Sequence, residues 1–88
     1  METNERKQTL MLEDRKRLII DGILNVESFN EDYLELSSNL GRIEIEGSSL
    51  KIEELRQDTG KILITGEISG VFYKENKTLK TPFSKIFR

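Results

Sequence analysis

The stretch that decides the fold is Lys61-Ile62-Leu63-Ile64-Thr65-Gly66-Glu67-Ile68-Ser69-Gly70-Val71-Phe72-Tyr73. Strict alternation along a strand sends successive side chains to opposite faces. One face would carry Ile62, Ile64, Ile68 and Phe72, and the other Leu63, Thr65, Glu67, Val71 and Tyr73. Gly66 and Gly70 interrupt the first face, where glycine lets a strand curve over a core or lets another backbone approach. The pattern predicts one long strand over residues 61–73.

Segments nearer the N-terminus repeat this alternation. Ile43 and Ile45 point one way while the charged residues around them point the other, as in a half-buried strand. Residues 33–40 alternate as well, and this pattern places Leu34, Leu36 and Leu40 on one face. Residues 17–29 form an extended segment broken at Gly22, where an isolated glycine suggests a bend. Residues 9–12 form a short strand or an arm.

Residues 51–58 are the one stretch with a helical spacing, because Ile52 and Leu55 stand three apart. We interpret the stretch as a strand that ends in the turn Gln57-Asp58-Thr59-Gly60. Further turns are expected at residues 13–16, at Asn30-Glu31-Asp32 and at residues 75–77. The chain has ten Ile and eleven Leu but no Ala, a composition that favours strands over helices.

These observations predict an all-β fold with six or seven short strands in a curved antiparallel sheet, a sandwich or a small open barrel. Three segments share the pattern basic, aliphatic, any residue, Ile, polar, Gly, at residues 17–22, 42–47 and 61–66. Such self-similarity can signal stacked repeats. Any strand that ends at a glycine turn also has this pattern, and we favour that simpler interpretation. A repeat-stacked β arrangement stays as the alternative.

The residue types available exclude several kinds of chemistry. The chain has no Cys and no His, so we expect no disulfide, no transition-metal site and no cofactor. Paired carboxylates could perform acid–base catalysis, and the candidates are Glu44 with Glu46 and Glu53 with Glu54. Both pairs fit a solvated surface better, because they stand on the polar side of a strand or beside a turn. We therefore predict that the protein is not an enzyme.

Charge divides the chain into an acidic body and a basic end. The net charge of −2 combines a balance of −6 over residues 1–73 with +4 over residues 74–88. We expect a flexible segment at residues 1–9, a β domain at residues 10–79 and a basic-aromatic tail at residues 80–88. An acidic body argues against nucleic-acid binding by the domain. The candidate docking or oligomer contacts all lie in the tail, at Lys80, Phe83, Lys85, Ile86, Phe87 and Arg88.

Two functions of this tail stay open. Basic residues beside bulky apolar ones suit an anionic membrane surface or the groove of a partner protein. Alternatively, residues 83–87 pack on the domain as a last strand, or cross to a second copy and complete a dimer. No apolar run approaches the roughly 18 residues that a membrane-spanning helix needs, so we expect no transmembrane segment and at most peripheral membrane contact.

Four blocks of the sequence together resemble the YabP family of sporulation proteins, which has a YqfC-like branch. The blocks are residues 14–22 followed by Val26-Glu27-Ser28-Phe29, residues 40–52, residues 60–73, and the ending Phe83-Ser84-Lys85-Ile86-Phe87-Arg88. The resemblance covers residues 10–88. It implies a part in spore formation in the mother cell, and it brings no catalytic or cofactor-binding residue with it.

We therefore expect a non-enzymatic structural or interaction module that acts in spore formation. Its expected partners are a second copy of itself and a protein of the spore assembly, in the mother-cell cytoplasm or at the forespore surface. The alternative is a small β-barrel that binds an oligonucleotide or a saccharide. Such a barrel needs exposed aromatic residues on one face, whereas alternation sends the neighbours Phe72 and Tyr73 to opposite faces.

Overall fold

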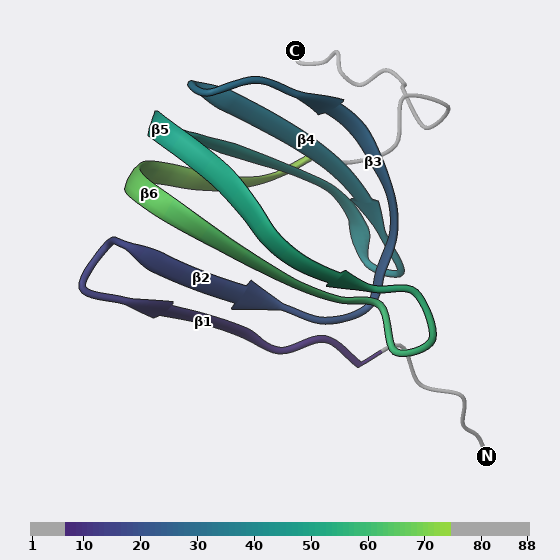
Figure 1. Cartoon of the computed structure of the whole chain (residues 1–88). Coiled ribbons are helices and arrows are strands. Elements are labelled where there is room, and N and C mark those ends of the chain that lie inside the picture. The colour runs from purple at the N-terminus through teal and green to yellow at the C-terminus, as the bar shows by residue number, and fades with distance from the viewer. Residues whose placement is uncertain (1–6, 75–88) are drawn as a thin grey trace, which may run out of the picture.

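Six antiparallel strands form one open sheet in the computed structural model, which describes residues 7–74 (Figure 1). The strands are β1 (Leu10–Glu13), β2 (Arg17–Ile20), β3 (Ile23–Phe29), β4 (Tyr33–Ser38), β5 (Gly41–Arg56) and β6 (Lys61–Lys74). Their order across the sheet is β1-β2-β6-β5-β4-β3. The all-β prediction of six or seven strands in a curved antiparallel sheet is confirmed, and residues 7–74 contain no helix.

The two longest strands, β5 and β6, bend near their middle and so divide the sheet into two layers (Figure 1). In the first layer, β1 and β2 lie beside the first half of β6 (residues 61–66), which pairs with the second half of β5 (residues 51–56). In the second layer, β3 and β4 lie beside the first half of β5 (residues 41–46), which pairs with the second half of β6 (residues 69–74). The long strand predicted over residues 61–73 is confirmed as β6, and β5 is long as well, because each of the two runs through both layers.

Glycines lie at the positions where the chain passes between the layers. A Cβ atom at Gly66 would lie 2.6 Å from the carbonyl oxygen of Ser49, and one at Gly47 would collide with the carbonyl oxygen of Glu67. Gly66 also has a φ of 133°, which L side chains rarely adopt. Of the two roles considered for these glycines, close approach of another backbone applies to Gly66. Gly22 lies between β2 and β3, so each of the three similar segments ends at a layer crossing, although β5 and β6 continue beyond it.

The core fills the space between the two layers with aliphatic side chains. Its fully buried members are Leu18, Ile20, Leu34, Leu36, Ile43, Ile45, Ile62, Ile64 and Ile68. Ile23 and Leu50 complete the buried cluster, and partly buried residues such as Val71 pack against it. Each strand from β2 to β6 contributes at least one of these residues, so the two layers stabilise each other through one thin hydrophobic core.

A bulge in β6 corrects the predicted faces of this strand. Ile68 pairs with Gly47 and Gly70 pairs with Glu46, so Ser69 is an extra residue. One extra residue exchanges the two faces of everything beyond it. Val71 consequently packs against the core, and Phe72 lies opposite Glu44 on the outer face. The prediction that Phe72 shares a face with Ile62, Ile64 and Ile68 was wrong for this reason.

A second correction concerns Leu40, which was placed on the buried face with Leu34 and Leu36. Leu40 lies in the turn between β4 and β5 and is exposed. Ser38 takes the buried position instead, because its hydroxyl donates to the carbonyl oxygen of Gly41 (2.6 Å) and accepts from the amide of Leu40 (3.2 Å). The predicted strand over residues 51–56 and the turn at residues 57–60 are confirmed.

Candidate functional site

The contacts predicted from the sequence lie outside the described residues. They are Lys80, Phe83, Lys85, Ile86, Phe87 and Arg88. Within residues 7–74, the surfaces with the clearest potential for binding are two grooves, one along each side of the rolled sheet where the layers do not join. The first is mainly apolar, and the second has a mixed lining of apolar and polar residues.

The first of these, the β1–β6 groove, lies between β1 and the second half of β6. It is lined mainly by Leu10, Leu12, Gly70 and Val71, and its volume is about 340 Å³. Leu12 and Val71 face it because their register partners, Leu18 and Ile45, point into the core. In the described part of the chain, no strand pairs with residues 69–74 on this side.

Hydrogen bonds fix the β1–β6 groove at both ends. At one end the guanidinium of Arg15 donates from Nε to the carbonyl oxygen of Ile68 (3.3 Å), and the Ile68 amide donates to the carbonyl oxygen of Arg15 (2.8 Å). At the other end the hydroxyl of Tyr73 donates to Oε1 of Gln8 (2.6 Å). These bonds set the separation between β1 and the second half of β6, so the groove is part of the fold.

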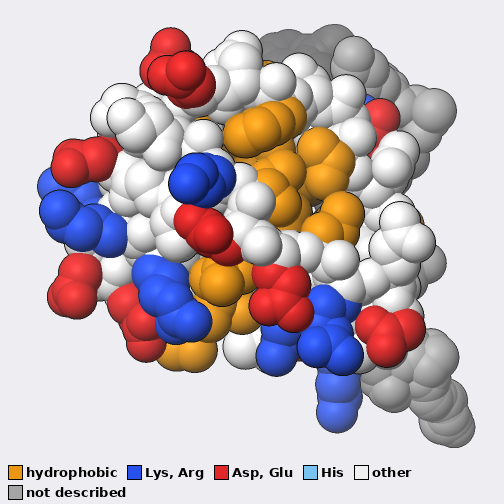
Figure 2. Space-filling model, viewed as in Figure 1, with side chains coloured by type: hydrophobic (Ala, Val, Ile, Leu, Met, Phe, Trp, Pro, Cys, Tyr) orange, Lys and Arg blue, Asp and Glu red, His pale blue; other side chains and the backbone are white. Residues whose placement is uncertain are grey.

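The second groove, the β3–β5 groove, lies between β3 and the second half of β5 and has a volume of about 330 Å³. Its apolar lining comes from Ile23, Leu24, Val26 and Leu55. Figure 2 shows hydrophobic side chains gathered on this face of the molecule. Leu24 is 71% exposed and Leu55 is 40% exposed, so large aliphatic surfaces stand in water here. Contiguous apolar surface of this kind often marks an interaction site.

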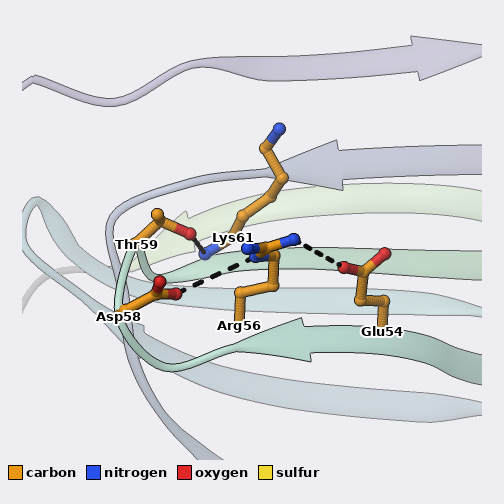
Figure 3. A network of polar contacts seen from close by, with 5 residues as sticks. All are labelled: Glu54, Arg56, Asp58, Thr59 and Lys61. Atoms are coloured by element: carbon orange, nitrogen blue, oxygen red, sulfur yellow. Dashed lines mark hydrogen bonds and ion pairs between the residues drawn. The ribbon is translucent and has the colours of Figure 1, made fainter.

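The strand edges beside the β3–β5 groove carry features that hinder strand pairing. β3 has two register shifts, after Ile23 and after Val26. The second half of β5 has one shift near Glu53 and a set of charged side chains. In Figure 3, Arg56 lies between Glu54 (3.5 Å) and Asp58 (3.8 Å) at the end of this strand. Bulges and charges are the usual protection of an exposed sheet edge.

The edge beside the β1–β6 groove is less protected. From Gly70 to Lys74 the pairing with β5 is regular, and the side chains between these two residues are Val71, Phe72 and Tyr73. Phe72 is 45% exposed and Tyr73 is 52% exposed. A regular, apolar and unpaired edge is a template for one more strand.

Comparison with known proteins connects this sheet with one protein family. Residues 4–80 match the sequence profile of the YabP family. The chain is also similar to the spore protein YabP of Bacillus subtilis (strain 168), with 29% identity over 80 residues that span 88% of this chain and 80% of the relative.

This chain belongs to the YabP family. The resemblance that the sequence blocks indicated is thereby confirmed. The family match extends over all six strands, so both grooves lie inside the region that defines a YabP-family protein.

Acidic side chains of this YabP-family sheet meet basic partners on its outer face. Arg42 forms an ion pair with Glu35 on the neighbouring strand, and the ammonium of Lys74 lies 3.5 Å from Glu44. The pKa of the Tyr33 hydroxyl is raised above its ordinary value. The larger cause is burial, and the second is the negative charge of Glu44. These contacts tie β4, β5 and β6 together.

Three of the four carboxylates considered for catalysis have structural partners. Glu44 pairs with Lys74, Glu54 pairs with Arg56, and Glu53 accepts a hydrogen bond from the Thr65 hydroxyl (2.8 Å). Among residues 7–74, no group of three or more Asp or Glu residues is arranged to hold a metal ion. The same part of the chain has no helix that could cross a membrane. As predicted, Phe72 and Tyr73 lie on opposite faces, so together they form no aromatic binding platform.

Sequence reasoning missed both grooves. Their walls come from strands far apart along the chain, and the facing of Val71 depends on the bulge at Ser69. One signal was present, because Val71-Phe72-Tyr73 places bulky apolar residues on both faces of a strand. A strand in a small domain with two apolar faces needs cover on both sides.

Proposed function

We propose that this YabP-family protein is a non-enzymatic interaction module that acts in spore formation. Family membership supports the process, since the relative from Bacillus subtilis is named a spore protein. The expected place of action is the mother-cell cytoplasm or the forespore surface. The described residues offer grooves with exposed aliphatic side chains and unpaired strand edges, which suit protein contacts more than chemistry on a small molecule.

One observation carries the proposal: the β3–β5 groove presents large aliphatic side chains to water. Leu24 and Leu55 line it, and Leu24 is the most exposed of the large hydrophobic residues within residues 7–74, while Leu55 is also exposed. Burying a large aliphatic side chain contributes roughly 1.5–3 kcal/mol, so two such residues can anchor a partner. The occupant we propose is a second copy of the chain, because a domain of this size has a thin core and gains from association.

The basic tail supplies the second contact in this proposal. Lys80, Lys85 and Arg88 add positive charge at the end of a chain whose first 73 residues are acidic. Opposite charges on two partners raise the rate of encounter and are screened by salt. We propose that these three residues attract an acidic protein of the spore assembly, with Ile86 and Phe87 providing apolar contact.

The test uses analytical ultracentrifugation of the full chain and a matched control. Leu24→Gln with Leu55→Gln replaces the two most exposed apolar side chains of the β3–β5 groove, whereas Leu40→Gln changes an exposed leucine in the β4–β5 turn. We expect wild type and Leu40→Gln to form dimers or larger species at micromolar concentration, and the double variant to sediment as a monomer. A monomeric wild type would contradict the self-association.

Function in the cell is tested with the same variants. A fluorescent fusion of the wild type should localise around the forespore, and the Leu40→Gln variant should follow it. The double variant and a chain with Lys80, Lys85 and Arg88 replaced by Gln should stay diffuse in the mother cell. Normal localisation and normal spore yield in both would count against a docking role for the groove and the tail.

A further inference from the structure

The β1–β6 groove differs from the β3–β5 groove in one respect that points to its occupant. Its unpaired edge belongs to β6, the last strand described, and the chain continues directly from the end of that edge. Lys74 pairs with Arg42 at the end of the second layer, and 14 residues follow it. A strand that ends beside an open edge can be followed by a hairpin onto that edge.

We propose that residues 78–83 of the same chain turn back and add a seventh strand, antiparallel to the second half of β6, which fills the β1–β6 groove. Glu75-Asn76-Lys77 would form the connecting loop. Three-residue loops are common in β-hairpins, and Asn is favoured in turns because it tolerates the left-handed conformation. The proposal concerns this groove alone and does not depend on the proposed function.

The sequence of the segment fits one register. A three-residue loop sets Leu79 opposite Tyr73 and Thr81 opposite Val71. Since Tyr73 and Val71 lie on the core face, Leu79 and Thr81 would point into the groove and Phe83 would follow at its far end. A slip of one residue would place Lys80 and Pro82 in the apolar groove instead, so the alternation selects this register.

The groove has room for these side chains. Its volume is about 340 Å³. An apolar cavity of about 150 Å³ is large enough for benzene, so the groove can hold an aliphatic and an aromatic side chain together. Arg15 closes the end of the groove next to Ile68, and Phe83 would stop beside it. The lining is mainly apolar, which suits Leu79 and Phe83.

The outward residues of the segment also match their neighbours. Lys80 would lie opposite Phe72, whose other neighbour across the sheet is Glu44. An ammonium group there gains from the aromatic ring and from the carboxylate. If Thr81 exchanges both backbone hydrogen bonds with Val71, the nitrogen of Pro82 points away from β6. The missing N–H of Pro82 then removes no bond from the ladder.

The same chain is favoured over a second copy by its tether. A loop of three residues holds the segment at an effective concentration on the order of millimolar, well above the micromolar range in which a second copy would compete. The segment therefore closes its own groove before another chain can enter it. Lys85 and Arg88 follow the proposed strand and stay available to a partner.

The first test is an engineered disulfide. Because the chain has no cysteine of its own, the two introduced thiols can pair only with each other or with those of another copy. Val71→Cys with Thr81→Cys places two thiols on directly opposite residues, and such pairs have Cα separations that a disulfide can span. We expect an intramolecular disulfide in most molecules after mild oxidation at low micromolar concentration. The control, Leu24→Cys with Thr81→Cys, puts the first thiol in the β3–β5 groove and should give little intramolecular product.

Two results of this experiment would overturn the proposal. Disulfide-linked dimers from Val71→Cys with Thr81→Cys would identify a second copy as the occupant. Equal intramolecular yields from the test pair and the control pair would mean that the segment has no preferred groove.

The second test needs no disulfide and uses hydrogen exchange of the full chain. Leu79→Asn puts a polar group into the groove, whereas Lys80→Arg changes the neighbouring, outward position and keeps its positive charge. We expect the amides of Val71 and Tyr73 to exchange at least tenfold faster in the Leu79→Asn variant and within about twofold of wild type in the Lys80→Arg variant. Unchanged exchange in the Leu79→Asn variant, or equal acceleration in both, would refute the seventh strand.

Discussion

The two halves of the β5–β6 hairpin have different surroundings. In the first half of β6, β2 pairs on one side and β5 on the other, and Ile62 and Ile64 are fully buried. In the second half of β6, β5 is the one strand that pairs among residues 7–74, and Phe72 and Tyr73 are about half exposed. One strand therefore passes from a central position in the first layer to an edge position in the second.

Because of this difference, the first half of β6 contributes mainly to stability and the second half offers a surface for recognition. The first half holds the two layers together through buried aliphatic side chains. The second half presents a regular edge and an apolar groove, features that a folded protein usually covers. Since Ser69 marks the boundary, the bulge both turns the strand and brings Val71 to the core side of the new edge.

The largest effect is expected from removing a core side chain in the first half of β6. Ile64→Ala should lower the free energy of unfolding by about 2–5 kcal/mol, because the fully buried side chain leaves a cavity. Val71→Ala in the second half should cost only about 1 kcal/mol, because Val71 is partly buried. Urea denaturation measures both. Equal losses would break the comparison and indicate that the two side chains contribute equally to the core.

A marginal domain could fail to fold with Ile64→Ala, so a milder pair keeps the test informative. Ile64→Val removes one methylene and should cost about 0.5–1.5 kcal/mol. Phe72→Leu, on the exposed outer face of the second half, should change stability by less than about 0.5 kcal/mol. A larger loss for Phe72→Leu than for Ile64→Val would reverse the order that burial predicts.

The next effect concerns the glycines of the two halves. Gly66→Ala should cost about 1–3 kcal/mol, because the left-handed backbone is strained for alanine and the Ser49 carbonyl oxygen is 2.6 Å from the new Cβ. Gly70→Ala should cost less than about 1 kcal/mol, since its new Cβ meets only the ring of Phe72, which can rotate away. Thermal unfolding of both variants checks the order. A greater loss for Gly70→Ala would mean that the Phe72 ring is held in place.

The sequence predicted the strands well and their surroundings poorly. Alternation located the long last strand, and the turns at residues 30–32 and 57–60 were recognisable from their composition. The exposure of Phe72 could not be predicted, because it depends on one unpaired residue, Ser69, that no local pattern reveals. The two grooves were equally hidden, since their walls meet only after β5 and β6 bend. The candidate contacts at residues 80–88 lie outside the described residues and stay predictions.

A smaller effect should distinguish the ion pairs on the two halves of β5. Arg42 and Glu35 are largely shielded from water, whereas Arg56 and Glu54 are about half exposed. Arg42→Met should therefore cost about 1.5 kcal/mol, and Arg56→Met no more than about 0.5 kcal/mol. Urea denaturation at low and high salt checks this. Added salt should weaken mainly the contribution of Arg56, and an equal salt response would show that Arg42 is as solvated as Arg56.

The smallest effect is the ionisation of Tyr33, which lies beside the first half of β5. Burial disfavours the phenolate, and the negative charge of Glu44 adds to this, so the pKa of Tyr33 is raised in the folded state. The unfolded chain loses this proton at a pH near the ordinary value of about 10, while the folded chain retains it. The contribution of Tyr33 to stability is therefore fully present below about pH 10 and declines as the pH rises from there through the raised value.

The measurement uses Tyr73→Phe, which leaves Tyr33 as the only tyrosine. Its phenolate absorbance should titrate with a midpoint above about 10 in the folded protein and near 10 in urea. Adding Glu44→Gln should lower the folded midpoint only in part, because burial is the larger cause. If Glu44→Gln lowered the folded midpoint of Tyr33 to the unfolded value, the charge of Glu44 and not burial would be the dominant cause of the raised pKa. This result would also show that the second layer leaves Tyr33 open to water.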